Sequence, residues 1–149
     1  MSNKKEMDVT QYSRSVFPKN KLGNYPNIEL NRNFTNESLK FMSHPWVAEF
    51  IANNIEAFTR RAHYFVIDVG AGIGGNTLQF LSRKNTAAVL SIEKNRERSV
   101  MLKRNIVAYD YGDKSIVLDK QIDKNTDFAD YQDAVFFLTH LGSLKKGDF

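Results

Sequence analysis

The residues best suited to chemistry lie in one stretch, HYFVIDVGAGIGGNTLQF, at positions 63–80. An apolar run there is followed by four closely spaced glycines, which are Gly70, Gly72, Gly74 and Gly75. Glycines let the backbone turn sharply and let a ligand approach without an intervening side chain. A helix that begins after the turn, near Asn76, presents unpaired backbone N–H groups, which attract anions. The stretch therefore predicts a strand, a ligand-binding turn and a helix.

Two classes of ligand place an anion at such a turn. A dinucleotide presents its pyrophosphate, and S-adenosylmethionine presents its methionine carboxylate. Gly70, Gly72 and Gly75 formally satisfy G-x-G-x-x-G, so the glycine spacing does not decide between the two. Asp68 favours S-adenosylmethionine, because a carboxylate repels a pyrophosphate but attracts an ammonium or sulfonium group, directly or through water. The alternative is that Asp68 only caps backbone N–H groups of the turn.

Glu93 supports a nucleoside ligand of either class. It stands at the end of the second predicted strand, 18 residues beyond Gly75. An acidic side chain about 20 residues after a glycine turn can bind both hydroxyls of a ribose. Alternatively, Glu93 caps the helix that is predicted to begin at Asn95. Both roles can coexist.

The elements that position these residues alternate along the chain. Apolar runs predict four strands, at residues 64–69, 87–93, 115–122 and 133–141. Helical segments are predicted at 76–83 and 95–110, and a short helix or turn at 126–131. Strands this apolar are buried on both faces, and strand–helix alternation favours parallel pairing through right-handed crossovers. The predicted fold class is α/β, a Rossmann-like half-sheet of about four parallel strands.

The segment before this core is predicted to differ from it. Residues 1–33 are irregular and form an arm, and residues 34–61 form a helical extension. Within the extension, SHPWVAEFIANNIEAF predicts a helix at 43–58 with Pro45 in its first turn. Its apolar residues at helical spacing are Val47, Phe50, Ile51, Ile55 and Phe58. The α/β core then spans 62–142 within a shortened domain of residues 34–149.

Composition excludes several classes of protein. The 149 residues contain no cysteine, which excludes disulfides and thiolate metal sites, and no metal-ligand spacing is present. No apolar run approaches the roughly 20 residues that span a bilayer. We therefore predict an intracellular protein, cytoplasmic or nuclear, with no membrane partner. The net charge of +4 permits a nucleic-acid partner, and the Asn- and Lys-rich composition suggests an AT-rich genome, cellular or viral.

A family resemblance rests on these motifs. DVGAGIGGNTLQF resembles motif I of class I S-adenosylmethionine-dependent methyltransferases. The continuation from Gly75 is most similar to the trimethylguanosine synthase group, the RNA cap guanine-N2 methyltransferases. VLSIEKNRERSVMLKRNIVAY extends the likeness, since Glu93 stands at the ribose-binding position and Asn105 and Tyr109 match the end of the next helix. The likeness covers roughly residues 64–142.

The resemblance implies a cofactor and the residues that bind it. The cofactor is S-adenosylmethionine, and the implied binding residues are Asp68, Gly70, Gly72, Gly74, Asn76, Glu93 and Gln121. Gln121 stands where the family has an acidic residue near the adenine. A Gln amide can still bond an adenine edge.

The sequence departs from the family at its fourth strand. Amino-directed methyltransferases end this strand with Asp, Asn or Ser, then two prolines and an aromatic residue, which position the target amine. This chain has Leu138-Thr139-His140-Leu141 instead. Methyl transfer depends on positioning, so the change removes a main contribution to catalysis. His140 is a weak candidate for a substitute base or stacking ring, and a surface histidine is the preferred interpretation.

The chain also carries fewer strands than the family fold implies. The strand at 134–141 would then be an open sheet edge, which favours pairing with a second copy or a protein partner. A fragment of a longer protein is the other explanation. The basic residues of the stretch 93–105 predict either an RNA-binding patch or a solvated helix face; they are Lys94, Arg96, Arg98, Lys103 and Arg104.

Two functional hypotheses follow. The first is an S-adenosylmethionine-dependent methyltransferase that acts on RNA, at N2 of the cap guanine. The second is a pseudoenzyme, a catalytically inactive descendant that serves as a binding, assembly or regulatory subunit. A nicotinamide dinucleotide module is a third reading, which Asp68 disfavours.

Overall fold

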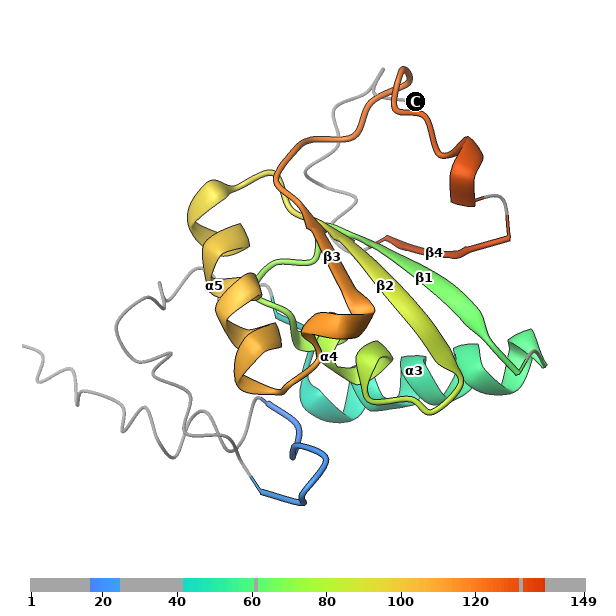
Figure 1. Cartoon of the computed structure of the whole chain (residues 1–149), viewed down its shortest axis with the longest axis vertical. Coiled ribbons are helices and arrows are strands. Elements are labelled where there is room, and N and C mark those ends of the chain that lie inside the picture. The colour runs from blue at the N-terminus through green and yellow to red at the C-terminus, as the bar shows by residue number, and fades with distance from the viewer. Residues whose placement is uncertain (1–16, 25–41, 61, 132, 139–149) are drawn as a thin grey trace, which may run out of the picture.

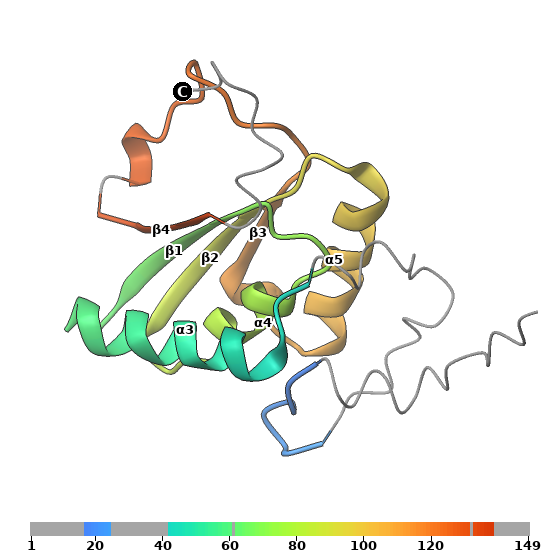
Figure 2. The same cartoon turned by 180° about the vertical axis from the view of Figure 1, so that it is seen from behind.

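The computed structural model describes residues 17–24, 42–60, 62–131 and 133–138. These residues form one sheet of four parallel strands in the order β3-β2-β1-β4. The strands are β1 (Tyr64–Val69), β2 (Thr86–Ile92), β3 (Ser115–Leu118) and β4 (Val135–Leu138). Figure 1 shows them in this order, and Figure 2 shows the same sheet from behind. The predicted α/β half-sheet of four parallel strands is confirmed.

Three α-helices pack on one face of this sheet. They are α3 (Pro45–Thr59), α4 (Gly75–Leu81) and α5 (Arg96–Ala108). Their buried side chains form a core with Tyr64, Val66 and Val89 of the sheet. On the opposite face, a second core joins Ile67 and Leu90 to residues of the segment after β3, which include Ile122, Phe128 and Tyr131. That segment contains the short 3-10 helix η3 (Ala129–Tyr131), and a further one, η2 (Gly112–Lys114), precedes β3.

The third strand is shorter than the sequence predicts. β3 ends at Leu118, whereas the apolar pattern predicted a strand through residue 122. Asp119, Lys120 and Gln121 are exposed, and Ile122 returns to the interior with 7% of its surface accessible. The three polar residues therefore leave the sheet, and Ile122 packs on it from the opposite face.

Helix α3 presents a different face to the core than its apolar pattern predicts. Phe50 and Phe58 are 64% and 89% exposed. The buried positions are Ala48 and Ala52, while Ile51 and Ile55 are only partly buried against the core. The small alanine side chains occupy the face that meets the other elements, and the two phenylalanines are turned outward. The helix ends at Arg60, which adopts a left-handed conformation with φ of 51°.

Part of the predicted N-terminal arm contacts the end of α5. Phe17 is 2% exposed, and the Tyr109 hydroxyl donates a hydrogen bond to the Pro18 carbonyl over 2.5 Å. The Lys21 ammonium donates to the Asp110 carbonyl at 3.1 Å and lies 4.8 Å from the centre of the Tyr111 ring. Residues 17–24 are therefore anchored to the domain. Positions 1–16 and 25–33 of the predicted arm lie outside the described residues.

Candidate functional site

The glycine turn between β1 and α4 crosses the carboxyl end of β2. The N–H groups of Gly70 and Ala71 both donate to the Ile92 carbonyl, at 2.9 and 3.1 Å. Gly72 has φ of 60°, and a Cβ added there would meet no atom within 4 Å. Gly74 has φ of 110°, and a Cβ there would lie 2.9 Å from Cδ1 of buried Leu102. The backbone therefore faces open space at Gly72, whereas Gly74 is required for packing.

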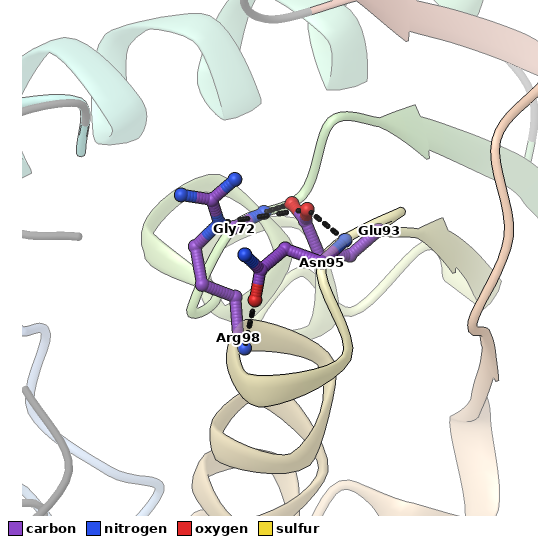
Figure 3. A network of polar contacts seen from close by, with 4 residues as sticks. All are labelled: Gly72, Glu93, Asn95 and Arg98. Carbon is purple, nitrogen blue, oxygen red and sulfur yellow. Dashed lines mark hydrogen bonds and ion pairs between the residues drawn. The ribbon is translucent and has the colours of Figure 1, made fainter. Parts of the chain in front are cut away.

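Glu93 joins this turn to α5. Its Oε2 atom accepts a hydrogen bond from the Gly72 N–H at 2.8 Å, and its Oε1 atom accepts one from the Asn95 N–H at 2.9 Å. The Arg98 Nε atom lies 3.5 Å from Oε1. Figure 3 shows these contacts converging on the one carboxylate. Glu93 is only 4% exposed, so the turn and the start of α5 share a buried, partly neutralised negative charge.

The cap of α5 itself comes from a neighbouring residue. The Asn95 side chain accepts a hydrogen bond from the Arg98 N–H at 3.0 Å, as N-cap residues commonly do. Glu93 instead accepts the N–H of Asn95, one step before the helix. Asn95 therefore caps the helix, and Glu93 holds the backbone of Asn95. A carboxylate oxygen such as Oε2 of Glu93 has the lone pairs to accept a second hydrogen bond.

Asp68 lies at the end of β1 with none of its surface exposed. Its Oδ2 atom accepts a 2.6 Å hydrogen bond from the Thr77 hydroxyl on α4, and that hydroxyl is 3.0 Å from the Ser91 hydroxyl on β2. Among the described residues, its Oδ1 atom has no hydrogen-bond partner. The carboxylate therefore lies beneath the turn and has no open surface of its own for a ligand.

Burial changes the acidity of Asp68. Loss of solvent raises the pKa of this carboxyl group from 3.8 to about 7, the Thr77 hydrogen bond opposes the rise, and the Glu93 charge adds to it. Asp68 is thus balanced between its neutral and ionised forms near neutral pH. A cation near the turn would favour the ionised form.

The start of α4 is covered by the segment that precedes α3. The Asn76 side-chain amide donates to the Ser43 hydroxyl at 2.9 Å, and Asn76 is 6% exposed. A Cβ on Gly75 would lie 2.8 Å from Cγ of Met42. Gly75 therefore allows this segment to approach, and Asn76 holds Ser43, a contact that is absent from the sequence-based prediction.

Asn105 fixes the turn from the opposite side. Its side-chain amide donates to the Ile73 carbonyl at 2.6 Å, and the residue has no exposed surface. Asn105 matched the family pattern in the sequence, but its contact with the turn depends on how α5 packs. Asn105 of α5 therefore holds the turn at Ile73, and Glu93, between β2 and α5, holds it at Gly72.

The structure brings together most of the predicted binding residues. Asp68, the glycines, Asn76 and Glu93 all lie at the junction of β1, β2 and α4. Gln121 is exposed in the segment after β3, and the described residues show no hydrogen bond from it to this junction. His140 lies outside the described residues. The roles of these residues toward a ligand stay predictions.

Sequence reasoning missed Thr77 and Ser91, and it named Arg98 only as part of a basic patch, not as a partner of Glu93. The strand register pairs Asp68 with Ser91, which places both side chains on one face of the sheet. If Gly70, the first residue after the first predicted strand, is aligned with Glu93, the last residue of the second, then Asp68 falls opposite Ser91. The sequence could therefore have suggested this pair. Thr77 required knowledge of how the first turn of α4 sits over the sheet.

The part of the chain that the structure describes contains no group of three His, Asp or Glu side chains placed to bind a metal ion. Its helices are also too short or too polar to cross a membrane.

Comparison with known proteins decides the family. Residues 63–141 match the family described as RNA cap guanine-N2 methyltransferase. The chain belongs to this family. The matched span runs from the residue before β1 past the end of β4 and so contains the whole glycine turn, Asp68 and Glu93. The resemblance to class I S-adenosylmethionine-dependent methyltransferases is thereby confirmed. No curated protein sequence matches the chain.

Solved methyltransferase structures share the fold. An S-adenosylmethionine-dependent O-methyltransferase from Thermotoga maritima has 18% identity and a TM-score of 0.56, over 77% of this chain and 41% of its own. A protein from Methanococcus maripaludis, assigned as an S-adenosylmethionine-dependent methyltransferase, has 14% identity and a TM-score of 0.58, over 67% and 45%. The N-terminal domain of EvdMO1, solved with S-adenosylhomocysteine bound, has 14% identity and a TM-score of 0.51, over 64% and 37%. This chain therefore spans less than half the length of each structure.

The residues present fit the cofactor of this family, S-adenosylmethionine. Gly72 faces open space, Oε2 of Glu93 can accept another hydrogen bond, and Oδ1 of buried Asp68 has no partner among the residues described. Ribose hydroxyls offer donors to Glu93, and the charge of an ammonium group is attracted by the buried Asp68 carboxylate. Asp68 differs from its prediction in one respect, because its full burial places it behind the turn rather than at an open surface.

Proposed function

We propose that this chain binds S-adenosylmethionine at the turn between β1 and α4 and acts as a methyltransferase module on RNA, with N2 of the cap guanine as the acceptor. The observation that carries the proposal is a pair of buried carboxylates, Asp68 and Glu93, beneath a glycine turn that is open at Gly72. This arrangement favours a cationic ligand that also has hydroxyl donors.

The two carboxylates have separate roles in the proposal. Glu93 accepts ribose hydroxyls while it keeps its bond to Gly72, since each carboxylate oxygen can accept more than one hydrogen bond. Asp68 attracts the ammonium group through its electrostatic field alone, because it has no exposed surface. The cofactor supplies a methyl group on a positively charged sulfur, and the protein must hold that group in line with its acceptor.

The charge of Asp68 counts against a dinucleotide. A pyrophosphate at the turn would lie close to this carboxylate, whereas Glu93 is suited to the ribose of either class of ligand. Helix α4 has only seven residues and carries no charged side chain to balance a phosphate. Electrostatics thus support S-adenosylmethionine over NAD.

RNA as the substrate rests on the family match and on charge. The family is described by an RNA cap activity over residues 63–141. The outer face of α5 carries exposed Arg96, Lys103 and Arg104, with Glu97 as its acidic exception. Basic side chains on one helix face favour contact with a phosphate backbone.

A second candidate function is supported by the end of β4. The positioning prolines of amino-directed enzymes are replaced there by Leu138-Thr139-His140-Leu141. Within the described residues, β4 pairs on one side only, with β1, so its other side is an edge. A catalytically inactive subunit that binds a second copy or another protein along 134–141 is consistent with both features.

Calorimetric titration tests cofactor binding first. Wild-type protein is titrated with S-adenosylmethionine, S-adenosylhomocysteine and NAD, and Glu93→Ala serves as the site variant. We expect binding of the first two ligands and at least tenfold weaker binding by the variant. Binding of NAD alone would overturn the proposal.

A transfer assay then separates the two candidate functions. Radiolabelled methyl donor is incubated with capped RNA and with uncapped RNA of the same sequence. Label that appears only on capped RNA supports the enzyme. Cofactor binding without transfer to either RNA supports the inactive subunit.

A further inference from the structure

Three hydroxyl and carboxyl groups form a buried chain behind the glycine turn. Asp68 on β1, Thr77 on α4 and Ser91 on β2 each have no exposed surface. The Thr77 hydroxyl donates to Oδ2 of Asp68 at 2.6 Å and lies 3.0 Å from the Ser91 hydroxyl. The three groups therefore tie the two central strands to the first helix after the turn.

The number of protons available fixes which group donates in each of these hydrogen bonds. The Thr77 hydroxyl has one proton, and it goes to Asp68 when that carboxyl group is ionised. The 3.0 Å contact with Ser91 is then a hydrogen bond only if Ser91 donates. When Asp68 is protonated, both bonds can reverse, so that Asp68 donates to Thr77 and Thr77 donates to Ser91. The direction of donation through Thr77 and Ser91 therefore depends on whether Asp68 is ionised or protonated.

Few charges act on Asp68 from the surrounding elements. It is the only charged residue of β1, and β2, α4 and β4 contain none. Glu93, just after β2, is the charged neighbour that affects it, and Arg98 of α5 lies beside Glu93. Among the residues that the structure describes, Thr77 is consequently the group that opposes burial and the Glu93 charge, and so favours the ionised form of Asp68.

We propose that Thr77, with Ser91 behind it, is a positioning residue that holds the Asp68 carboxylate in place and in its ionised form, and so sets the pH range in which the turn binds a ligand with an ammonium group. This inference rests on the proposed binding of S-adenosylmethionine. It adds to that function two residues that need not touch the ligand.

Affinity as a function of pH tests the inference. S-adenosylhomocysteine is titrated calorimetrically between pH 5.5 and 7.5, a range in which its α-amino group keeps its proton. In the wild type, affinity should rise with pH with its midpoint near the Asp68 pKa of about 7, so that the rise slows above pH 7. Thr77→Val keeps the side-chain shape but removes the donor, so its affinity should rise up to pH 7.5 without slowing.

Two further variants make the comparison quantitative. Thr77→Ser retains the hydroxyl and should restore the wild-type profile, with its midpoint within about 0.3 pH units. Loss of a hydrogen bond to a charged group corresponds to a midpoint shift of about one pH unit or more for Thr77→Val. Ser91→Ala removes only the second donor and should shift the midpoint upward by less.

A measurement without ligand gives an independent readout. The ¹³Cγ chemical shift of Asp68 is followed by NMR against pH in wild type, Thr77→Ser and Ser91→Ala. The expected order of the Asp68 pKa is wild type, equal to Thr77→Ser, below Ser91→Ala. This order can be read even if Thr77→Val does not fold.

The outcomes separate the inference from the proposed function. Wild-type protein that binds no S-adenosylhomocysteine at any pH overturns both together. Binding by the wild type with the same affinity across the pH range, or an unchanged midpoint in Thr77→Val, overturns the inference alone. Equal Asp68 pKa values in all variants also overturn it.

Discussion

Gly72 and Glu93, 21 residues apart in the sequence, are joined by a 2.8 Å hydrogen bond from the Gly72 N–H to Oε2 of Glu93. The same carboxylate accepts the Asn95 N–H, so one side chain fixes both the glycine turn and the approach to α5. In a Rossmann-like sheet these two loops lie at the carboxyl ends of neighbouring parallel strands, where ligands bind. The bond therefore shapes the site before any ligand arrives.

The first prediction concerns this carboxylate. Glu93→Gln keeps the shape of the side chain, but its NH₂ group must face either the Gly72 or the Asn95 N–H, and two donors cannot bond each other. We expect the free energy of unfolding to fall by about 1–3 kcal/mol, as for a buried donor left unpaired. Urea denaturation followed by circular dichroism measures the change.

An exposed glutamate four residues further along the chain provides the control. Glu97 lies in the first turn of α5, and its replacement by Gln removes only a favourable interaction with the helix dipole, about 0.3–1 kcal/mol. Equal losses for Glu93→Gln and Glu97→Gln would contradict a special role for the buried carboxylate.

The second prediction ranks three glycine substitutions. Gly74→Ala combines φ of 110° with a Cβ placed 2.9 Å from Leu102 Cδ1, so it should destabilise most, by more than about 2 kcal/mol. Gly72→Ala has φ of 60° and free space, so only the conformational cost of about 1–2 kcal/mol applies. Gly112→Ala has neither constraint and should lie within about 0.5 kcal/mol of the wild type. Thermal or urea unfolding measures the order, and a reversed order refutes this account of the turn.

The parts of the fold that local sequence determines were predicted well. β1 covers Tyr64–Val69 as predicted, because an apolar run and a glycine turn define its two ends. The outward orientation of Phe50 and Phe58 on α3 was not predictable in this way. Periodicity shows that a helix has an apolar face, but the packing of Ala48 and Ala52 decides which face is buried.

In the candidate site too, sequence patterns could be predicted and packing contacts could not. Asp68, Gly72 and Glu93 were recognisable because their types and spacing along the chain carry the pattern. Thr77 and Asn105 act across the fold, toward Asp68 and the Ile73 carbonyl, and these contacts depend on how α4 and α5 sit on the sheet. The burial of Asp68 likewise depends on the turn that folds over it, and composition cannot show it.

The third prediction concerns the hydrogen bond by which Asn105 of α5 fixes the glycine turn. Asn105→Ala removes the 2.6 Å hydrogen bond to the Ile73 carbonyl and leaves that carbonyl without its side-chain partner. We expect a loss of about 1–3 kcal/mol in unfolding free energy, together with weaker binding of S-adenosylhomocysteine. Urea unfolding and calorimetry measure the two effects.

A second asparagine offers the matched control. The Asn54 amide also donates to a backbone carbonyl, that of Phe50 at 2.7 Å, but it lies on the exposed side of α3. Water can replace that bond, so Asn54→Ala should change stability by less than about 0.5 kcal/mol and leave ligand binding unaltered. A similar loss in both variants would show that burial of the Asn105 bond is unimportant.

The fourth prediction follows from the acidity of Asp68. Its pKa is about 7 in the folded protein and 3.8 when solvated, so the folded state binds the proton more tightly. The contribution of Asp68 to stability is therefore fully present below about pH 4 and is lost as pH rises through about 7, by up to roughly 4 kcal/mol. Asp68→Asn cannot titrate, so the difference in unfolding free energy between variant and wild type should increase in favour of the variant from pH 4 to pH 8. Urea denaturation at unit pH intervals measures this difference, in which the other titrating groups cancel, and a difference that stays constant with pH would show that Asp68 is ionised throughout.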